Sequence, residues 1–251
     1  MAEQDSLTRA IPVAPSVRRF ARERDFWKRF KRRRVGLVSF IILLIIAFAA
    51  AFPGLISNHD PIAYDADAPL VRFTADHWLG TDSLGRDTYS RLVTGARTAI
   101  LVGLLSVAIG VGIGLPIGIL AGWWGGRRDE FLMRLMDSLF AFPSLLLALL
   151  IITGLGPGLQ NVTIAIGIPF IAVFARIARG STLSVKEQEY IMAALSIGSS
   201  DRRIAARHIL PNILAPIIVQ ASLLFGIAII IEAALSFLGL GTLPPNPSWG
   251  I

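Results

Sequence analysis

The reactive side chains of this sequence offer little material for catalysis. The 251 residues include no cysteine and only three histidines, so disulfides, thiolate metal sites and cysteine nucleophiles are excluded. The phosphate-binding pattern G-x-x-x-x-G-K-[ST], the G-x-S-x-G nucleophile turn and the H-E-x-x-H zinc motif are all absent from the sequence. We therefore predict that the polypeptide is not an enzyme and carries no cofactor of its own.

Two of the histidines, His59 and His77, lie in a polar segment, residues 57–98, that also holds six aspartates. A transition-metal site needs imidazoles and carboxylates that converge, and the spacing here is not typical of such ligands. The aspartates and glycines suit turns and helix caps better, and Asp87 can cap a helix that starts at Thr88. The sequence thus predicts no metal site.

Glu232 is an ionisable residue inside a long apolar segment. It lies about 20 residues, or about 30 Å of helix, after Pro211, near the far boundary of a membrane. A charge at such depth is a functional-site candidate that faces a bundle interior. An interfacial glutamate that faces water or a helix backbone is the alternative, so Glu232 is a pathway candidate with both interpretations open.

A polar, basic stretch, residues 184–211, separates two of the apolar segments. Ser184 followed by Glu187 is a capping-box pattern, which predicts the start of a helix. Gly198 predicts the end of that helix, because glycine adopts the left-handed conformation at little cost. The first half of this stretch is therefore expected to be a short, capped helix.

A second helix is expected directly after the glycine. Ser199 or Ser200 can cap it, Asp201 suits its first turn, and Pro211 is predicted to close it and to open the next apolar helix at its first position. The faces of this hairpin carry small residues: Ala193, Ala194, Gly198, Ala205 and Ala206. A helix that lies on lipid needs bulky apolar residues, so the composition favours docking to another protein.

Composition and patterning place these residues in a membrane protein. Hydrophobic residues make up 54% of the chain and charged residues 16%, whereas soluble domains average about 25% charged. Each apolar segment is near the ~20 residues that a membrane helix needs: 35–56, 99–124, 132–153, 159–179 and 213–238. The predicted fold class is an all-α polytopic transmembrane bundle, whose first span is too long and too far from the start for a signal peptide.

The distribution of positive charge predicts orientation. Of the 24 Lys and Arg residues, 20 lie in residues 1–34, 125–134 and 176–211. Because positive charge is enriched in cytoplasmic segments, the basic N-terminal tail 1–34 is predicted to be cytoplasmic and the loop 57–98 extracytoplasmic. The net charge of +7 is thus explained by membrane orientation, and nucleic acid is not expected as a partner.

Two further patterns concern helix packing. Glycines four residues apart share one helical face: Gly110, Gly114, Gly118 and Gly122. Such a face allows close backbone approach in lipid, either to a helix of the same chain or at a moving or subunit interface. Arg134 and Asp137 lie three residues apart in the third apolar segment, and we expect them to pair across one turn.

The hairpin sequence resembles the EAA loop of membrane subunits from binding-protein-dependent ABC importers, E-A-A-x3-G-x9-I-x-L-P. Residues that match it in register are Ala193, Ala194, Gly198, Leu210 and Pro211. Met192 replaces the glutamate and His208 the isoleucine. Other segments are similar to the dipeptide/oligopeptide/nickel permeases: 79–87, 140–147, 235–241, Pro244-Pro245 and Trp249-Gly250.

The resemblance implies a multi-pass permease subunit of a bacterial or archaeal inner membrane. It implies a permease core, residues 99–251, with a coupling loop at about 181–211 that seats on one of two cytoplasmic ATPases, which bind ATP. A second permease and an extracytoplasmic binding protein are the other implied partners. The coupling residues carried over are Ala193, Ala194, Gly198, Leu210 and Pro211, to which we add Asp201 for its exposed capping position.

Two expectations remain open at the level of sequence. Five spans put the C-terminus outside, and the family continues after Trp-Gly with another helix, so we expect that final helix to be lacking here. The alternatives to an importer subunit are a proton-coupled transporter that uses Glu232 or Asp137, and a non-transporting membrane scaffold. A peptide, a nickel complex or another small solute would fit as substrate.

Overall fold

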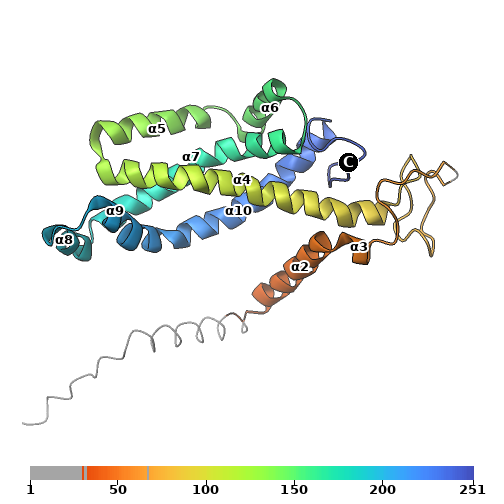
Figure 1. The fold of residues 1–251 in the computed structure, drawn as a ribbon, viewed down its shortest axis with the longest axis horizontal. Helices are drawn as coiled ribbons and strands as arrows, with labels where there is room; N and C mark the ends of the chain where they lie inside the picture. The colour runs from red at the N-terminus through yellow and green to blue at the C-terminus, as the bar shows by residue number, and fades with distance from the viewer. Residues whose placement is uncertain (1–29, 31–32, 67) are drawn as a thin grey trace, which may run out of the picture. The chain divides into compact units, whose positions relative to one another are not determined.

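The computed structural model describes residues 30, 33–66 and 68–251 (Figure 1). These divide into two compact units, one up to Phe48 and the other from Ala49 to Ile251. Helix α2, Arg34–Ala51, carries most of the first unit's described residues. The predicted basic tail lies largely outside the described residues.

The second unit is built of helices and holds every candidate site residue. Their bounds are Pro53–Ile56 (α3), Thr88–Trp124 (α4), Gly126–Phe140 (α5), Ser144–Leu155 (α6), Leu159–Lys186 (α7), Glu189–Ser196 (α8), Asp201–Ile204 (α9), Ala205–Ile209 (the π-helix η1) and Leu210–Phe237 (α10). Four helices in the described part of the chain are long and apolar enough to cross a membrane, or five if a bent pair counts as one span. The predicted all-α polytopic bundle is confirmed.

Helix α4 starts well before the predicted span of residues 99–124. Asp87 caps it as expected, because its Oδ2 accepts a hydrogen bond from the Ser90 backbone N–H at 2.7 Å. The helix then runs for 37 residues to Trp124, far more than the ~20 that cross hydrocarbon. The non-helical part of the predicted polar loop 57–98 therefore ends at Asp87, and its remaining residues form the first turns of α4.

Helices α4 and α7 form the closest pair in the unit, and the four-residue glycine pattern is the reason. A Cβ on Gly114 would lie 2.3 Å from the carbonyl oxygen of Ile171, and one on Gly118 would lie 2.2 Å from that of Ala175. Gly110 and Gly122 also face α7. The intrachain interpretation of the glycine face is the one that the structure shows.

The predicted third span, residues 132–153, is not one straight helix. Helices α5 and α6 meet at an angle of 86°. Pro143 precedes α6, and a proline there has no N–H to donate and its ring clashes with the preceding turn. The chain therefore turns at residues 141–143 instead of continuing through the apolar run.

The expected pairing of Arg134 with Asp137 is also wrong. Arg134 donates to Glu130 one turn earlier at 2.7 Å, and Asp137 accepts from Arg176 on α7 at the same distance. Spacings of three and four residues are both neighbours on a helix, so the local pattern allowed either partner. Asp129 forms a two-point pair with Arg179, with Oδ2 accepting from Nη2 at 2.7 Å, and these contacts attach α5 to α7.

Candidate functional site

The predicted hairpin, α8 and α9, lies at one end of the unit formed by residues 49–251. The loop that precedes α4 lies at the opposite end (Figure 1). Helix α4 runs between these two ends, next to α7 and α10. A polar hairpin and a polar loop at opposite ends of an apolar bundle fit a protein that meets different partners on the two sides of a membrane.

The start of the hairpin differs from the capping-box prediction. Ser184 lies inside α7, where its hydroxyl donates to the Gly180 carbonyl at 3.3 Å and leaves the helical ladder intact. Serine can bond back one turn in this way instead of capping. The first hairpin helix consequently starts at Glu189, after an extended Gln188.

The end of α8 at Gly198 is confirmed, and its geometry is a Schellman motif. Gly198 has φ +76, and its N–H donates to the carbonyl of Leu195 at 2.9 Å. The N–H of Ser199 donates to the carbonyl of Ala194 at 3.1 Å, which is the pair of bonds that defines the motif. A residue with a side chain at position 198 would be strained by the positive φ.

Pro211 does not close the second half of the hairpin, but it does lie in the first turn of α10, as predicted for the start of the next helix. Helices α9, η1 and α10 follow one another without a break from Asp201 to Phe237. The π-turn just before Pro211 widens the backbone, with the Leu210 N–H reaching the Ala205 carbonyl. The Asn212 side chain also donates to the His208 carbonyl at 2.6 Å. These contacts let the helix accept a proline that would otherwise stop it.

The two faces of the hairpin have different roles. Its inner face packs into the main core of the bundle through residues that are buried: Ile191, Ala194, Ile204 and Ile209. Leu210 is half-buried against the same core. Among the predicted coupling residues, Ala193, Gly198, Asp201 and Pro211 are exposed, so only these can meet a partner directly.

The outward face is bulkier than the predicted alanine-rich surface. Four of its exposed residues are large and apolar: Tyr190, Met192, Leu195 and Ile197. The side chain of Ile197 stands out with 82% of its area exposed, next to Gly198. These four residues, which we call the outer hairpin face, were not predicted from the sequence. For Met192 and Leu195 the sequence holds a signal, because they lie two positions before and one position after the buried Ala194 and on a helix therefore point away from it.

A basic residue ties the hairpin to α4. The Lys186 ammonium, at the last turn of α7, donates to the Trp123 carbonyl at 2.6 Å and lies 5.4 Å from the centre of the Trp123 ring. A cation at the carbonyl end of a helix is favoured by the helix dipole. The segment that leads into α8 is thereby fixed to the ends of both α4 and α7.

Glu232, the pathway candidate, is fully buried at the far end of α10. Its Oε1 accepts hydrogen bonds from the Ser236 hydroxyl at 2.7 Å and from the Thr242 hydroxyl at 3.3 Å. The water-facing interpretation is therefore wrong, and Glu232 faces inward. Its contacts hold the loop that follows α10, and Trp249 on this loop donates to the Leu92 carbonyl of α4 at 3.0 Å.

The loop before α4 is ordered around two aspartates. Asp82 accepts from the Leu84 and Arg86 backbone N–H groups and from the Arg86 side chain. Burial alone would raise its pKa, but these bonds stabilise the carboxylate and bring the pKa below the ordinary value. The loop is thus a defined structure.

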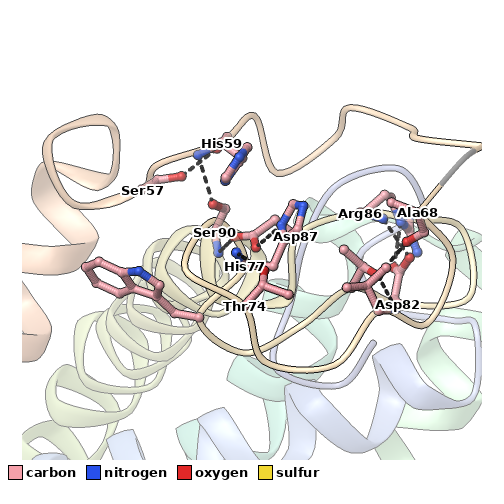
Figure 2. Close-up of polar contacts among 12 residues, drawn as sticks. Ser57, His59, Ala68, Thr74, His77, Asp82, Arg86, Asp87 and Ser90 are labelled. Carbon is pink, nitrogen blue, oxygen red and sulfur yellow. Dashed lines mark hydrogen bonds and ion pairs between the residues drawn. The ribbon is translucent and has the colours of Figure 1, made fainter.

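His59, His77 and Asp87 converge in this loop, contrary to the sequence-based expectation (Figure 2). The ring nitrogen Nδ1 of His77 lies 2.9 Å from Asp87 Oδ1, and the His59 and His77 rings stack with centres 4.7 Å apart. Their separation in sequence hid this convergence, which depends on how the loop folds back over the start of α4.

Comparison with known proteins identifies the family of this chain. Residues 114–251 match the family described as binding-protein-dependent transport system inner membrane component, and residues 23–71 match the N-terminal TM domain of oligopeptide transport permease C. The chain belongs to this family of transport permeases. It is 42% identical to the glutathione transport system permease protein GsiD of Pectobacterium atrosepticum over 228 residues, which cover 90% of this chain and 76% of that protein.

Other relatives give the same result. The dipeptide transport system permease protein DppC of Alkalihalophilus pseudofirmus is 42% identical over 227 residues, or 90% of this chain and 75% of that protein. In fold, the permease is similar to a chain of the inward-facing MetNI methionine ABC transporter, with TM-score 0.55 and 19% identity over 61% of this chain and 76% of that one.

The family assignment decides between the alternatives left open by the sequence. The predicted resemblance to the permeases of peptide importers is confirmed, and the chain is a membrane-spanning permease component of an ABC importer. A proton-coupled transporter and a non-transporting scaffold are therefore not supported. The relatives are permeases and not enzymes, in agreement with the missing catalytic motifs.

Proposed function

We propose that this permease couples to a cytoplasmic ATPase subunit through the outer hairpin face and Ala193, Gly198 and Asp201. The observation that carries the proposal is the α8–α9 hairpin itself, which matches the EAA-loop spacing and presents exposed apolar side chains at the end of the bundle. An exposed apolar patch marks a contact with a protein or with lipid, and the EAA-loop spacing of this hairpin favours the protein. ATP then binds to the partner, and this chain contributes no cofactor.

The packing of the hairpin explains how a push on it would reach the membrane. Ile191, Ile204 and Ile209 belong to the same buried core as α7 and α10, so the hairpin cannot tilt without moving these helices. The glycine contacts lock α7 to α4. Because close-packed interiors transmit displacement and do not absorb it, the hairpin and α4, α7 and α10 would move as one body against a second permease subunit.

The outer end of the bundle has the complementary role in this proposal. A binding protein would deliver solute to the surface formed by the loop before α4 and the loop after α10. Glu232 acts there as a residue beside the pathway, and its bonds to Ser236 and Thr242 set the shape of the second loop. For the substrate we propose a small peptide, because the relatives at 42% identity are named for glutathione and dipeptides.

Uptake by the complete importer tests this function. Proteoliposomes that contain this chain, the second permease and the ATPases, together with the binding protein, are expected to take up a labelled dipeptide or glutathione only with ATP. Ile197→Glu, which leaves the buried face of the hairpin intact, should strongly reduce uptake while the chain still inserts. Uptake driven by a proton gradient without ATP would contradict the proposal, and labelled Ni²⁺ in the same assay tests the nickel alternative.

Membrane orientation can be measured because the chain has no cysteine. We propose that the N-terminus and the hairpin are cytoplasmic, since positive charge is enriched there. A maleimide that cannot cross membranes should label Phe73→Cys in intact cells or spheroplasts and leave Ile197→Cys unlabelled until the membrane is opened. Both side chains are more than three-quarters exposed, at 77% and 82%. The reverse labelling pattern would overturn the orientation.

A further inference from the structure

We propose that His59, His77 and Asp87 form a binding site for a divalent d-block cation of the Zn²⁺ type on the outer loop. Each of the three offers one ligand atom, and these atoms all lie within 4.8 Å of one another. Two imidazoles and a carboxylate are a donor set that zinc and similar cations prefer. The site is separate from the hairpin, so it does not depend on the function proposed above.

The distances already approach those of a coordination sphere. Tetrahedral zinc with bonds of about 2.0–2.1 Å places its ligand atoms roughly 3.3 Å apart. His77 Nδ1 and Asp87 Oδ1 are 2.9 Å apart, so a cation that bridges them needs only a small separation of these atoms. It would occupy the place of the Nδ1 proton, and that imidazole proton would then reside on Nε2.

The third ligand, His59, can complete the site by rotation of its side chain. His59 is exposed, and its backbone is held in place from both sides. Its N–H donates to the Ser90 hydroxyl at 3.3 Å, and its carbonyl accepts from the Ser57 hydroxyl at 2.6 Å (Figure 2). Because the backbone of His59 is fixed and its imidazole can rotate, the site is largely preformed and His59 is its one adjustable ligand.

The two carboxylate oxygens of Asp87 have different partners. Oδ2 caps helix α4 by accepting from the Ser90 N–H at 2.7 Å, which leaves Oδ1 for the cation. The pKa of this carboxyl would be raised by burial, but the bonds from Ser90 and His77 lower it below the ordinary value. The anionic form also offsets the positive end of the α4 dipole, which would otherwise repel a cation.

Three protein ligands leave the fourth tetrahedral position open. Side-chain exposure falls from His59, which is exposed, to His77 at 18% and Asp87 at 3%. The open position therefore faces solvent on the side of His59, where water can complete the coordination. Hard cations such as Mg²⁺ are not expected, because they prefer oxygen ligands and retain their waters.

Zinc binding to the purified chain tests the site. The full chain, prepared without a polyhistidine tag, is titrated with Zn²⁺ by calorimetry, and Co²⁺ in its place reports tetrahedral coordination by visible absorption. We expect one Zn²⁺ per chain and at least tenfold weaker binding for His59→Ala. Asp87→Asn, which keeps a capping side chain, should weaken binding to a similar extent.

The chain provides its own control, because its remaining histidine is His208 on η1, at the opposite end of the bundle. His208→Ala should bind Zn²⁺ as the unmodified chain does. The proposal is overturned if the unmodified chain binds no Zn²⁺, or if His59→Ala binds as tightly as it. Neither result would bear on ATPase coupling, which is read by co-purification with the hairpin intact.

Discussion

Replacing Ile197 with glutamate is expected to detach the permease from its ATPase while leaving the permease folded. Ile197 is 82% exposed at the tip of the outer hairpin face, so its side chain contributes little to the free energy of unfolding of the chain itself. In a docked complex the same position would place a charge in an apolar contact. A central interface residue changed in this way costs about 2 kcal/mol or more, roughly 30-fold in affinity.

The measurement is co-purification of the ATPase subunits with the permease from detergent-solubilised membranes, followed by titration of the purified subunits. Ile197→Leu is the matched control for shape and should retain binding. Ser184→Glu adds the same charge to an exposed position on α7 and should have no effect. If Ile197→Glu binds the ATPase as well as Ile197→Leu does, the outer hairpin face is not the docking surface.

Replacing Gly118 with alanine is expected to destabilise the packing of α4 against α7 strongly, although it adds only one methyl group. The added Cβ would lie 2.2 Å from the Ala175 carbonyl oxygen and 2.6 Å from the Ala178 Cβ. The first atom is part of the α7 backbone and the second is bonded to it, so neither can move aside as the end of a flexible side chain can. Overpacking of this kind costs about 1–3 kcal/mol, and separation of α4 from α7 should lower the thermal midpoint measurably.

Gly112 on the same helix provides the control. A Cβ there meets nothing within 4 Å, and alanine is a better helix former than glycine by about 1 kcal/mol. Gly112→Ala should therefore leave the thermal midpoint unchanged or raise it slightly. Equal midpoints for Gly118→Ala and Gly112→Ala, measured in the same detergent, would show that the close approach of α4 to α7 contributes nothing to stability.

Membrane helices and their type could be read from the sequence because their cause is local. An apolar run of about 20 residues must form a helix in lipid, where each backbone polar group needs a partner within the segment. Caps are equally local, so Asp87 and Gly198 could be assigned to the ends of α4 and α8 correctly. The four-residue spacing of the glycines similarly indicated a close helix contact, although it did not say with which helix.

Competing local signals caused the errors. Ser184 matches a capping box, but α7 continues through it to Lys186. Pro211 is a helix-stop signal, but the π-turn before it lets the helix continue. At Pro143 a break was missed, because the long apolar run 132–153 predicted one continuous helix where the chain bends by 86°. In each case several local preferences were compatible with the sequence, and packing against neighbouring helices selected one of them.

The sequence by itself determined that this chain is an all-α membrane protein with a helix–glycine–helix hairpin and no catalytic motif, since these properties depend on residues close in the chain. Only the tertiary structure decided which side of the hairpin is buried, that Glu232 faces inward, and that His59, His77 and Asp87 meet. These depend on contacts between residues far apart in sequence, and loop closure and helix packing set such contacts without a local pattern to reveal them.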